Sequence, residues 1–169
     1  VPAEEARVSV LDNGFAFGDS VYEVLRTYGG LAFEPGRHFR RLRASAARLG
    51  FSVPASDADL LAQADALLAR AGTGESYIRI IVSRGLGDCS YSFERVQGPT
   101  VVMIQKPLPP YPAWHYEDGI QIAAVGVRRN HPRALDPAIK SSNLLNNILA
   151  VREAQSRGAE EPVLLNQEG

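Results

Sequence analysis

The stretch from Val21 to Leu49 reads VYEVLRTYGGLAFEPGRHFRRLRASAARL, and it changes from strand-like to helix-like composition on either side of a turn. Residues 21–28 are rich in Val, Leu and Tyr, which favours a β-strand. The Gly29-Gly30 pair and the apolar residues 31–33 after it predict a hairpin. Beyond it, an amphipathic helix is predicted to begin at Pro35 and to end near Gly50, because four apolar residues recur at helical spacing: Phe39, Leu42, Ala46 and Leu49.

Further elements are predicted on both sides of this stretch. A second helix should run from a cap at Ser56 or Asp57 through Ala71 and end at Gly72. The long loop 85–99 is rich in Gly, Ser, Asp and Pro, and loops of that length in compact domains are usually functional or mobile. Composition also predicts three further strands: Arg7 to Leu11, Ser76 to Arg84 and Thr100 to Gln105.

Four prolines between Lys106 and Pro112 predict a stiff, extended connector and a domain boundary. We therefore expect an α+β fold, with a small two-layer α+β domain at residues 1–106 and a connector at 107–113. Residues 114–169 would begin a larger α/β domain that is incomplete at its C-terminal end. Its expected elements are a strand from Ile120 to Val125, a helix from about Asn143 to Ser156, and a strand at Pro162 to Leu165.

Composition narrows the class of protein. The 169 residues are 45% hydrophobic and 22% charged, as in ordinary globular proteins, and the net charge of −1 argues against a dedicated nucleic-acid binder. Cys89 has no partner for a disulfide, which favours a reducing compartment, and no metal-ligand spacing is present. No apolar run is long enough for a membrane span and no signal peptide is recognisable, so we expect a cytoplasmic protein.

Lys140 is the residue with the most specific chemical potential. It follows a proline-containing loop and precedes a predicted helix N-terminus capped by Ser142 or Asn143, where positive potential disfavours an ammonium. A desolvated lysine there would offer the neutral amine that Schiff-base chemistry requires. The alternative from local sequence alone is a solvated lysine at a loop end.

Two arginines are candidates for binding an anion. Arg41 lies on the basic helix beside the apolar stripe and could bind a phosphate; the alternative is a solvated basic face. Arg79 alternates with apolar residues in a predicted strand, on the same face as Tyr77 and Ile81. It could face an anionic ligand or form a structural salt bridge.

Three segments together resemble the fold-type IV (class IV) pyridoxal-phosphate enzymes, a family of branched-chain aminotransferases, D-amino-acid aminotransferases and aminodeoxychorismate lyases. The first segment is Asp12-Asn-Gly-Phe-Ala-Phe-Gly-Asp-Ser-Val-Tyr-Glu-Val24, and the second is His38-Phe-Arg-Arg-Leu-Arg-Ala-Ser-Ala46. The third is Ile139-Lys-Ser-Ser-Asn-Leu-Leu-Asn-Asn-Ile-Leu-Ala150. The resemblance covers nearly all of the chain.

The resemblance implies pyridoxal 5'-phosphate as the cofactor and assigns a role to five residues. Lys140 resembles the lysine that forms the Schiff base with the cofactor and carries the substrate proton. Arg41 resembles the arginine that holds the cofactor phosphate, and Glu161 resembles a supporting glutamate near the lysine. Tyr22 and Arg79 resemble substrate-binding residues, with Arg79 a candidate partner of a substrate carboxylate.

The resemblance also predicts the reaction. We expect an aminotransferase that moves an amino group between an amino acid, possibly branched-chain, and a 2-oxo acid, in a homodimer. The alternatives are an aminodeoxychorismate lyase that eliminates pyruvate, or an inactive fragment or homologue with a binding or structural role. Cys89 and Tyr91 replace the Arg-x-His pair of D-amino-acid aminotransferases, and the glutamate that pairs with the pyridine nitrogen is expected beyond Gly169.

Overall fold

The structure is a computed structural model that describes residues 1–72 and 74–169. It divides into two compact units. The first unit comprises Val1–Pro109 and the short segment Ile139–Ser142, and the second comprises Pro110–Ala138 and Asn143–Gly169. The chain thus leaves the first unit within the proline-rich stretch and returns to it for four residues that include Lys140. The predicted boundaries at 106, 107–113 and 114 stay predictions.

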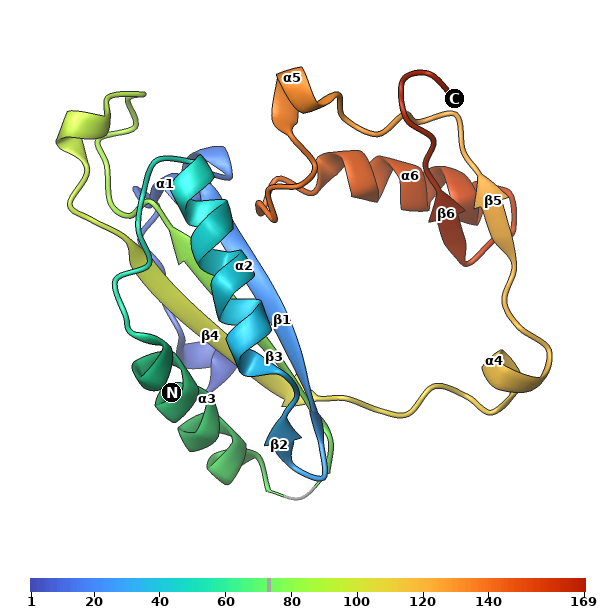
Figure 1. Ribbon diagram of the computed structural model, residues 1–169, viewed down its shortest axis with the longest axis horizontal. Coiled ribbons are helices and arrows are strands. Elements are labelled where there is room, and N and C mark those ends of the chain that lie inside the picture. The colour runs from blue at the N-terminus through green and yellow to red at the C-terminus, as the bar shows by residue number, and fades with distance from the viewer. Residues whose placement is uncertain (73) are drawn as a thin grey trace. The chain divides into compact units, whose positions relative to one another are not determined.

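A four-stranded antiparallel sheet organises the first unit, with the strand order β2-β1-β3-β4 (Figure 1). The Gly29-Gly30 turn joins β1 to β2 as predicted, and both glycines have positive φ angles of 59° and 79°. Such angles are easily adopted only by residues without a Cβ. The strands are β1 (Ser20–Tyr28), β2 (Leu31–Ala32), β3 (Ser76–Ser83) and β4 (Thr100–Pro107).

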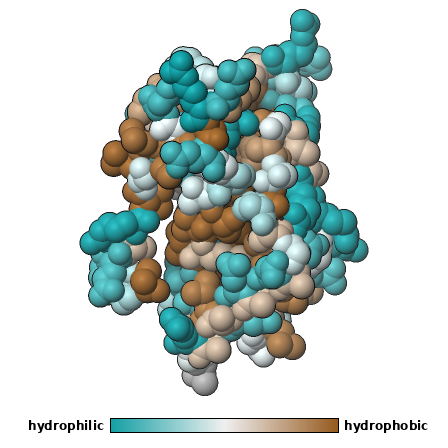
Figure 2. Space-filling model, turned by 90° about the vertical axis from the view of Figure 1, so that its left-hand side faces the viewer, coloured by the Kyte–Doolittle hydropathy of each residue, from teal (hydrophilic) through white to brown (hydrophobic). Residues whose placement is uncertain are grey.

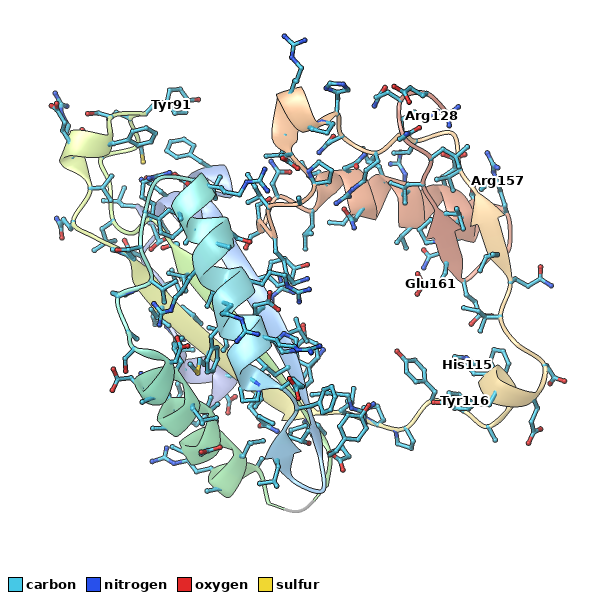
Figure 3. The ribbon with its side chains drawn as sticks, in the orientation of Figure 1. Tyr91, His115, Tyr116, Arg128, Arg157 and Glu161 are labelled. Atoms are coloured by element: carbon cyan, nitrogen blue, oxygen red, sulfur yellow. The ribbon has the colours of Figure 1, made fainter. Side chains whose placement is uncertain are left out.

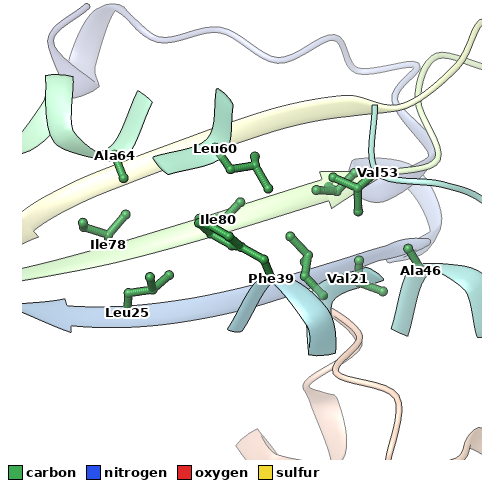
Figure 4. Close-up of a cluster of buried hydrophobic side chains, with 11 residues drawn as sticks. Val21, Leu25, Phe39, Ala46, Val53, Leu60, Ala64, Ile78 and Ile80 are labelled. Atoms are coloured by element: carbon green, nitrogen blue, oxygen red, sulfur yellow. The ribbon is translucent and has the colours of Figure 1, made fainter. Parts of the chain in front are cut away.

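Two helices cover one face of this sheet, which confirms the two-layer α+β prediction (Figure 1). Helix α2 (Pro35–Arg48) packs on β1, and α3 (Asp57–Ala71) packs on β3 and β4. Ser56 caps α3 in a reciprocal capping box with Asp59, as the predicted start of this helix requires. The core between the layers contains eleven buried side chains, most of which are labelled in Figure 4: Val21, Leu25, Phe39, Leu42, Ala46, Val53, Leu60, Ala64, Ile78, Ile80 and Val82.

The opposite face of the sheet is not covered by α2 or α3. Along β1 and β3, residues on the helix-covered face are buried and those on the other face are half-buried or exposed up to the last residues of β3. The register pairs Tyr22 with Ile81 and Val24 with Arg79, which places these four side chains together on the second face. We call this second face the open face.

The strand predicted at Arg7 to Leu11 is wrong. These residues form no strand, and Val8, Val10 and Leu11 are exposed. A β-like composition does not supply a partner strand, and without one the backbone groups gain nothing from an extended ladder. The following turn is a short helix, α1 (Asn13–Phe17), because the Asp12 side chain accepts a hydrogen bond from the Gly14 N–H at 2.8 Å.

The second unit contains a short parallel pair of strands, β5 (Ile122–Ala124) and β6 (Glu161–Val163). Helix α6 (Leu145–Ser156) connects them and packs on both. Two single-turn helices precede α6, namely α4 (Trp114–Glu117) and α5 (Pro132–Leu135). Four small or β-branched side chains form the core of this unit: Val125, Ala150, Ala154 and Ala159.

Large hydrophobic side chains also reach the surface. Figure 2 shows brown hydrophobic atoms gathered between teal polar ones on one face of the molecule. Tyr91 and Phe93 in the 85–99 loop are 86% and 71% exposed, and Phe15 in α1 is 72% exposed. None of the helices in the described part of the chain has the length and apolar character needed to cross a membrane.

Candidate active site

The segment that carries Lys140 adds to the outer edge of β1. The Tyr22 N–H donates a hydrogen bond to the Lys140 carbonyl at 2.9 Å, and the Ser142 N–H donates one to the Ser20 carbonyl at 2.9 Å. On its other side, the Lys140 N–H donates to Ser45 Oγ in α2 at 3.2 Å. The backbone of Lys140 is therefore held between the sheet and helix α2.

This pairing explains why the predicted cap of the next helix is wrong. Helix α6 begins at Leu145 with Leu144 at the N-cap position, and no side chain caps it. Ser142 is instead bonded to β1, and its neighbour Ser141 forms a β-bridge with Val21. Residues held extended against a strand do not supply the geometry of a helix cap.

Three of the predicted site residues meet on the open face. Lys140 Nζ lies 4.4 Å from the centroid of the Tyr22 ring, and Arg79 Cζ lies 4.2 Å from the same centroid. An aromatic ring attracts a cation through the negative potential of its face. The structure thus brings Lys140, Tyr22 and Arg79 together, with two cationic side chains on one ring.

Arg79 has the environment of a ligand-binding residue more than that of a structural one. Its Nε is buried and has no hydrogen-bond partner among the described residues, and the same is true of Ser142 Oγ. The predicted alternative, a structural salt bridge, is not formed by Arg79 within residues 1–72 and 74–169. A buried donor without a partner is costly, which favours a bound anion or water at this position.

A pocket of about 310 Å³ lies on the open face beside these two groups. Arg79 and Ser142 line it, together with apolar side chains from β3, β4 and α1. A few polar groups in a mainly apolar pocket are typical of small-molecule sites. The apolar lining includes Phe15, Ile81, Val102 and Ile104.

Arg41 is held from the helix-covered face of the sheet. Its Nε and Nη2 donate hydrogen bonds to Glu23 Oε1 at 2.5 Å and Oε2 at 2.8 Å, so the pair is bidentate. His38 Nδ1 lies 2.8 Å from the same Oε2. Glu23 is fully buried, whereas the Arg41 side chain is 55% exposed. The structure therefore joins Arg41 to a buried carboxylate and leaves part of its guanidinium at the surface.

Glu23 and His38 are functional candidates to which the sequence assigned no role. A signal for Glu23 was present, because a carboxylate occupies a core-facing position of β1 between Val21 and Leu25, both of which are buried apolar residues. Burial raises the pKa of the Glu23 carboxyl, but hydrogen bonds and charges from Arg41 and His38 outweigh this effect. The pKa of Glu23 consequently lies below its ordinary value of 4.5. The hydrogen bond to Glu23 in turn raises the pKa of Arg41.

Glu161 belongs to the second unit and not to the cluster described above. It is the first residue of β6 and is exposed (Figure 3). Its backbone N–H points to the Gln121 carbonyl at 3.4 Å. A supporting role for Glu161 near the lysine stays a prediction.

The residues of the first unit fit the cofactor that the sequence predicts. A carbonyl-bearing cofactor with a phosphate needs an accessible amine and a fixed cation. Lys140 supplies an amine with no carboxylate partner in the described part of the chain, and Arg41 supplies a guanidinium whose Nη1 is not used by Glu23. Consecutive residues of β1 hold both groups, since the Tyr22 backbone bonds to Lys140 and the Glu23 carboxylate bonds to Arg41. The fold and the site together define the class of pyridoxal-phosphate enzymes.

Comparison with known proteins identifies the family. The family model described as "Amino-transferase class IV" matches residues 20–169, and the chain belongs to this family. A Methanocaldococcus jannaschii protein, provisionally named a branched-chain-amino-acid aminotransferase, is 36% identical over 169 residues, which are 100% of this chain and 58% of that protein. The chain thus spans little more than half the length of this relative.

Solved structures agree on the fold. The branched-chain amino acid aminotransferase of T.th. with pyridoxamine 5'-phosphate has a TM-score of 0.86 and 26% identity, over 100% of this chain and 57% of that chain. A 4-amino-4-deoxychorismate lyase from Pseudomonas aeruginosa has a TM-score of 0.79 and 30% identity, over 96% and 58%. The predicted family, fold class and cofactor class are confirmed, and the relatives include both aminotransferases and a lyase.

Proposed function

We propose that the protein is a pyridoxal-phosphate aminotransferase that moves an amino group between an amino acid and a 2-oxo acid, with Lys140 at the reacting centre. The observation that carries this proposal is the position of the Lys140 amine, which lies over the Tyr22 ring with no carboxylate partner among the described residues. A lysine without an ion pair is available for chemistry, whereas a paired lysine would have to break its salt bridge first.

Lys140 and Arg41 would hold the cofactor. When bound, pyridoxal phosphate supplies a carbonyl that reacts with amines and a ring that accepts electrons. Lys140 Nζ would bind the cofactor and then take and return the proton at the substrate's Cα. Arg41 would anchor the phosphate through the N–H groups that Glu23 does not use.

Arg79 and Tyr22 would bind the substrate. The unpartnered Nε of Arg79 supports a role in pairing with a substrate carboxylate, since guanidinium and carboxylate match in geometry and charge. The Tyr22 ring contacts both Lys140 and Arg79, so it holds the two cations at one place on the open face. The apolar lining of the 310 Å³ pocket supports a substrate with an apolar side chain, such as a branched-chain amino acid.

Aminodeoxychorismate lyase activity is the second candidate, because a lyase of 30% identity shares the fold over nearly the whole chain. An inactive homologue is the third. Retention of Lys140, Arg41 and Tyr22 in bonded positions supports an active protein over this third candidate. Glu161 as a supporting residue and the homodimer remain part of the proposal.

The experiment uses the protein at its full natural length, loaded with pyridoxal phosphate. Leucine, isoleucine or valine is added without any 2-oxo acid, and the products are measured by chromatography. We expect one 2-oxo acid per active site, formed once and then stopping until an acceptor is supplied. Continuous pyruvate release from aminodeoxychorismate without an acceptor would identify the lyase, and no product from either compound would support the inactive homologue.

A further inference from the structure

A buried carboxylate in β1 controls the direction of an exposed arginine. We propose that Glu23, supported by His38, is a positioning residue that presents Arg41 to the cofactor phosphate. This inference rests on the proposed function, because it takes Arg41 as the phosphate anchor.

The bond geometry fixes the guanidinium in two dimensions. Both oxygens of Glu23 accept from Arg41, and the two donors, Nε and Nη2, lie on one edge of the guanidinium plane. A bidentate pair of this kind allows little rotation about the last side-chain torsions. Nη1 therefore points away from Glu23, on a side chain that is 55% exposed. Arg41 also lines a pocket of about 340 Å³.

His38 keeps Glu23 itself in place. It lies one helical turn before Arg41 on α2, and its Nδ1 lies 2.8 Å from Oε2, the oxygen that also accepts from Arg41 Nη2. Because its side chain is only 21% exposed, this contact is shielded from water. A carboxylate with contacts on both oxygens has one orientation, and so has the arginine attached to it.

Fold stability alone gives no reason for a carboxylate at this position. Glu23 is flanked on its face of the strand by Val21 and Leu25, and all three are fully buried. Removing a carboxylate from water is costly, and apolar residues often replace buried ion pairs with no loss of stability. A fixed cation, by contrast, binds an anion without the entropy loss of ordering a free side chain.

The test compares two ligands that differ only in the phosphate. Dissociation constants for pyridoxal 5'-phosphate and for pyridoxal are measured by absorbance titration of the full-length protein and its Glu23→Gln variant. We expect Glu23→Gln to weaken pyridoxal phosphate about tenfold and to change pyridoxal affinity less than about twofold. A merely structural role would weaken both ligands equally, and that result would overturn the proposal.

Glu75→Gln is the matched control. Glu75 is also a carboxylate that accepts two bonds at the sheet, from Thr27 Oγ1 at 2.5 Å and the Gly29 N–H at 2.8 Å, and neither partner is Arg41. This variant should leave the ratio of the two affinities unchanged. In an Arg41→Ala background, Glu23→Gln should have no further effect on pyridoxal phosphate binding, and a further tenfold loss there would overturn the proposal.

His38→Gln decides the question if Glu23→Gln does not fold, as judged by circular dichroism. A loss of about threefold in pyridoxal phosphate affinity, with pyridoxal unchanged, supports the proposal. An unchanged ratio overturns it. Failure of the natural protein to bind pyridoxal phosphate at all would instead overturn the proposed function, so the two failures are distinguishable.

Discussion

The two faces of the β2-β1-β3-β4 sheet treat their arginines differently. On the helix-covered face, Arg41 is bound through two hydrogen bonds by a fully buried glutamate. On the open face, Arg79 contacts an aromatic ring and keeps a buried Nε without a partner in the described chain. The protein thus fixes the direction of the first arginine itself, and it leaves the second for a ligand to satisfy.

This difference separates folding from binding. The helix-covered face holds the core and the groups that orient an anchor, so changes there should affect stability as well as cofactor affinity. The open face holds the groups that would touch reacting molecules, so changes there should affect catalysis and leave stability nearly unchanged.

The largest effect is expected for Lys140, on the open face. We expect Lys140→Ala to lower the rate of 2-oxo acid formation about 10³-fold or more, because the reacting amine and proton carrier are both lost. Lys106→Ala is the control, since Lys106 is the other lysine of the chain and also lies over a tyrosine ring, 4.7 Å from the centroid of Tyr77. Equal losses in the two variants, measured by steady-state kinetics, would contradict the assignment.

Two consecutive residues of β3 separate the stability of the faces. Ile80 is fully buried on the helix-covered face, and Ile81 is half-buried on the open face. We expect Ile80→Ala to lower the free energy of unfolding by about 3 kcal/mol and Ile81→Ala by about 1 kcal/mol or less. Urea denaturation measures both, and equal losses would show that the open face is covered in the folded protein.

A smaller effect on catalysis is expected for Arg79. Replacement by Met keeps an apolar side chain near the Tyr22 ring but removes the donors for a carboxylate. We expect Arg79→Met to lower kcat/KM about 30-fold with an unchanged urea midpoint, since a hydrogen bond to a charged group contributes about 2 kcal/mol. Arg40→Met, at an exposed position of α2, should change neither. A lowered urea midpoint with unchanged kcat/KM would assign Arg79 to folding instead.

The smallest effect is a pH dependence of stability on the helix-covered face. The pKa of Glu23 in the folded protein lies below 4.5, so its bonds contribute stability above that pH. The contribution is lost as pH falls through the lower folded-state pKa. Between about pH 5 and about pH 3, the unfolding free energy of Glu23→Gln should therefore fall less steeply than that of the natural protein. Parallel curves from urea titrations would show that the Glu23 carboxylate is not stabilised by Arg41 and His38.

Local signals in the sequence predicted the local structure. The Gly-Gly turn, the apolar spacing of α2 and the Ser56 cap of α3 each act within a few residues, and each predicted element is present. Pairing between distant segments was not predictable in this way. The strand at Arg7 to Leu11 has a suitable composition but no partner, whereas residues 139–142 have no strand pattern and yet pair with β1.

The same limit applies to the site. The sequence singled out Lys140, Arg41, Tyr22 and Arg79, mainly through a family resemblance, but it gave no contact between them. Glu23 shows what sequence reasoning could have found, because a carboxylate at a core-facing strand position requires a buried partner. Its two partners lie on α2, some 15 and 18 residues away, and only the packing of that helix on β1 reveals them.

The most direct test of the central claim is to locate the amine that binds the cofactor. The full-length protein is incubated with pyridoxal phosphate, reduced with borohydride, digested and analysed by mass spectrometry. Reduction converts a lysine–cofactor bond to a stable secondary amine, so the modified peptide identifies the lysine. We predict a pyridoxyl adduct on the peptide that contains Lys140 and none on the peptide that contains Lys106. An unmodified Lys140 after saturation with the cofactor would contradict the account.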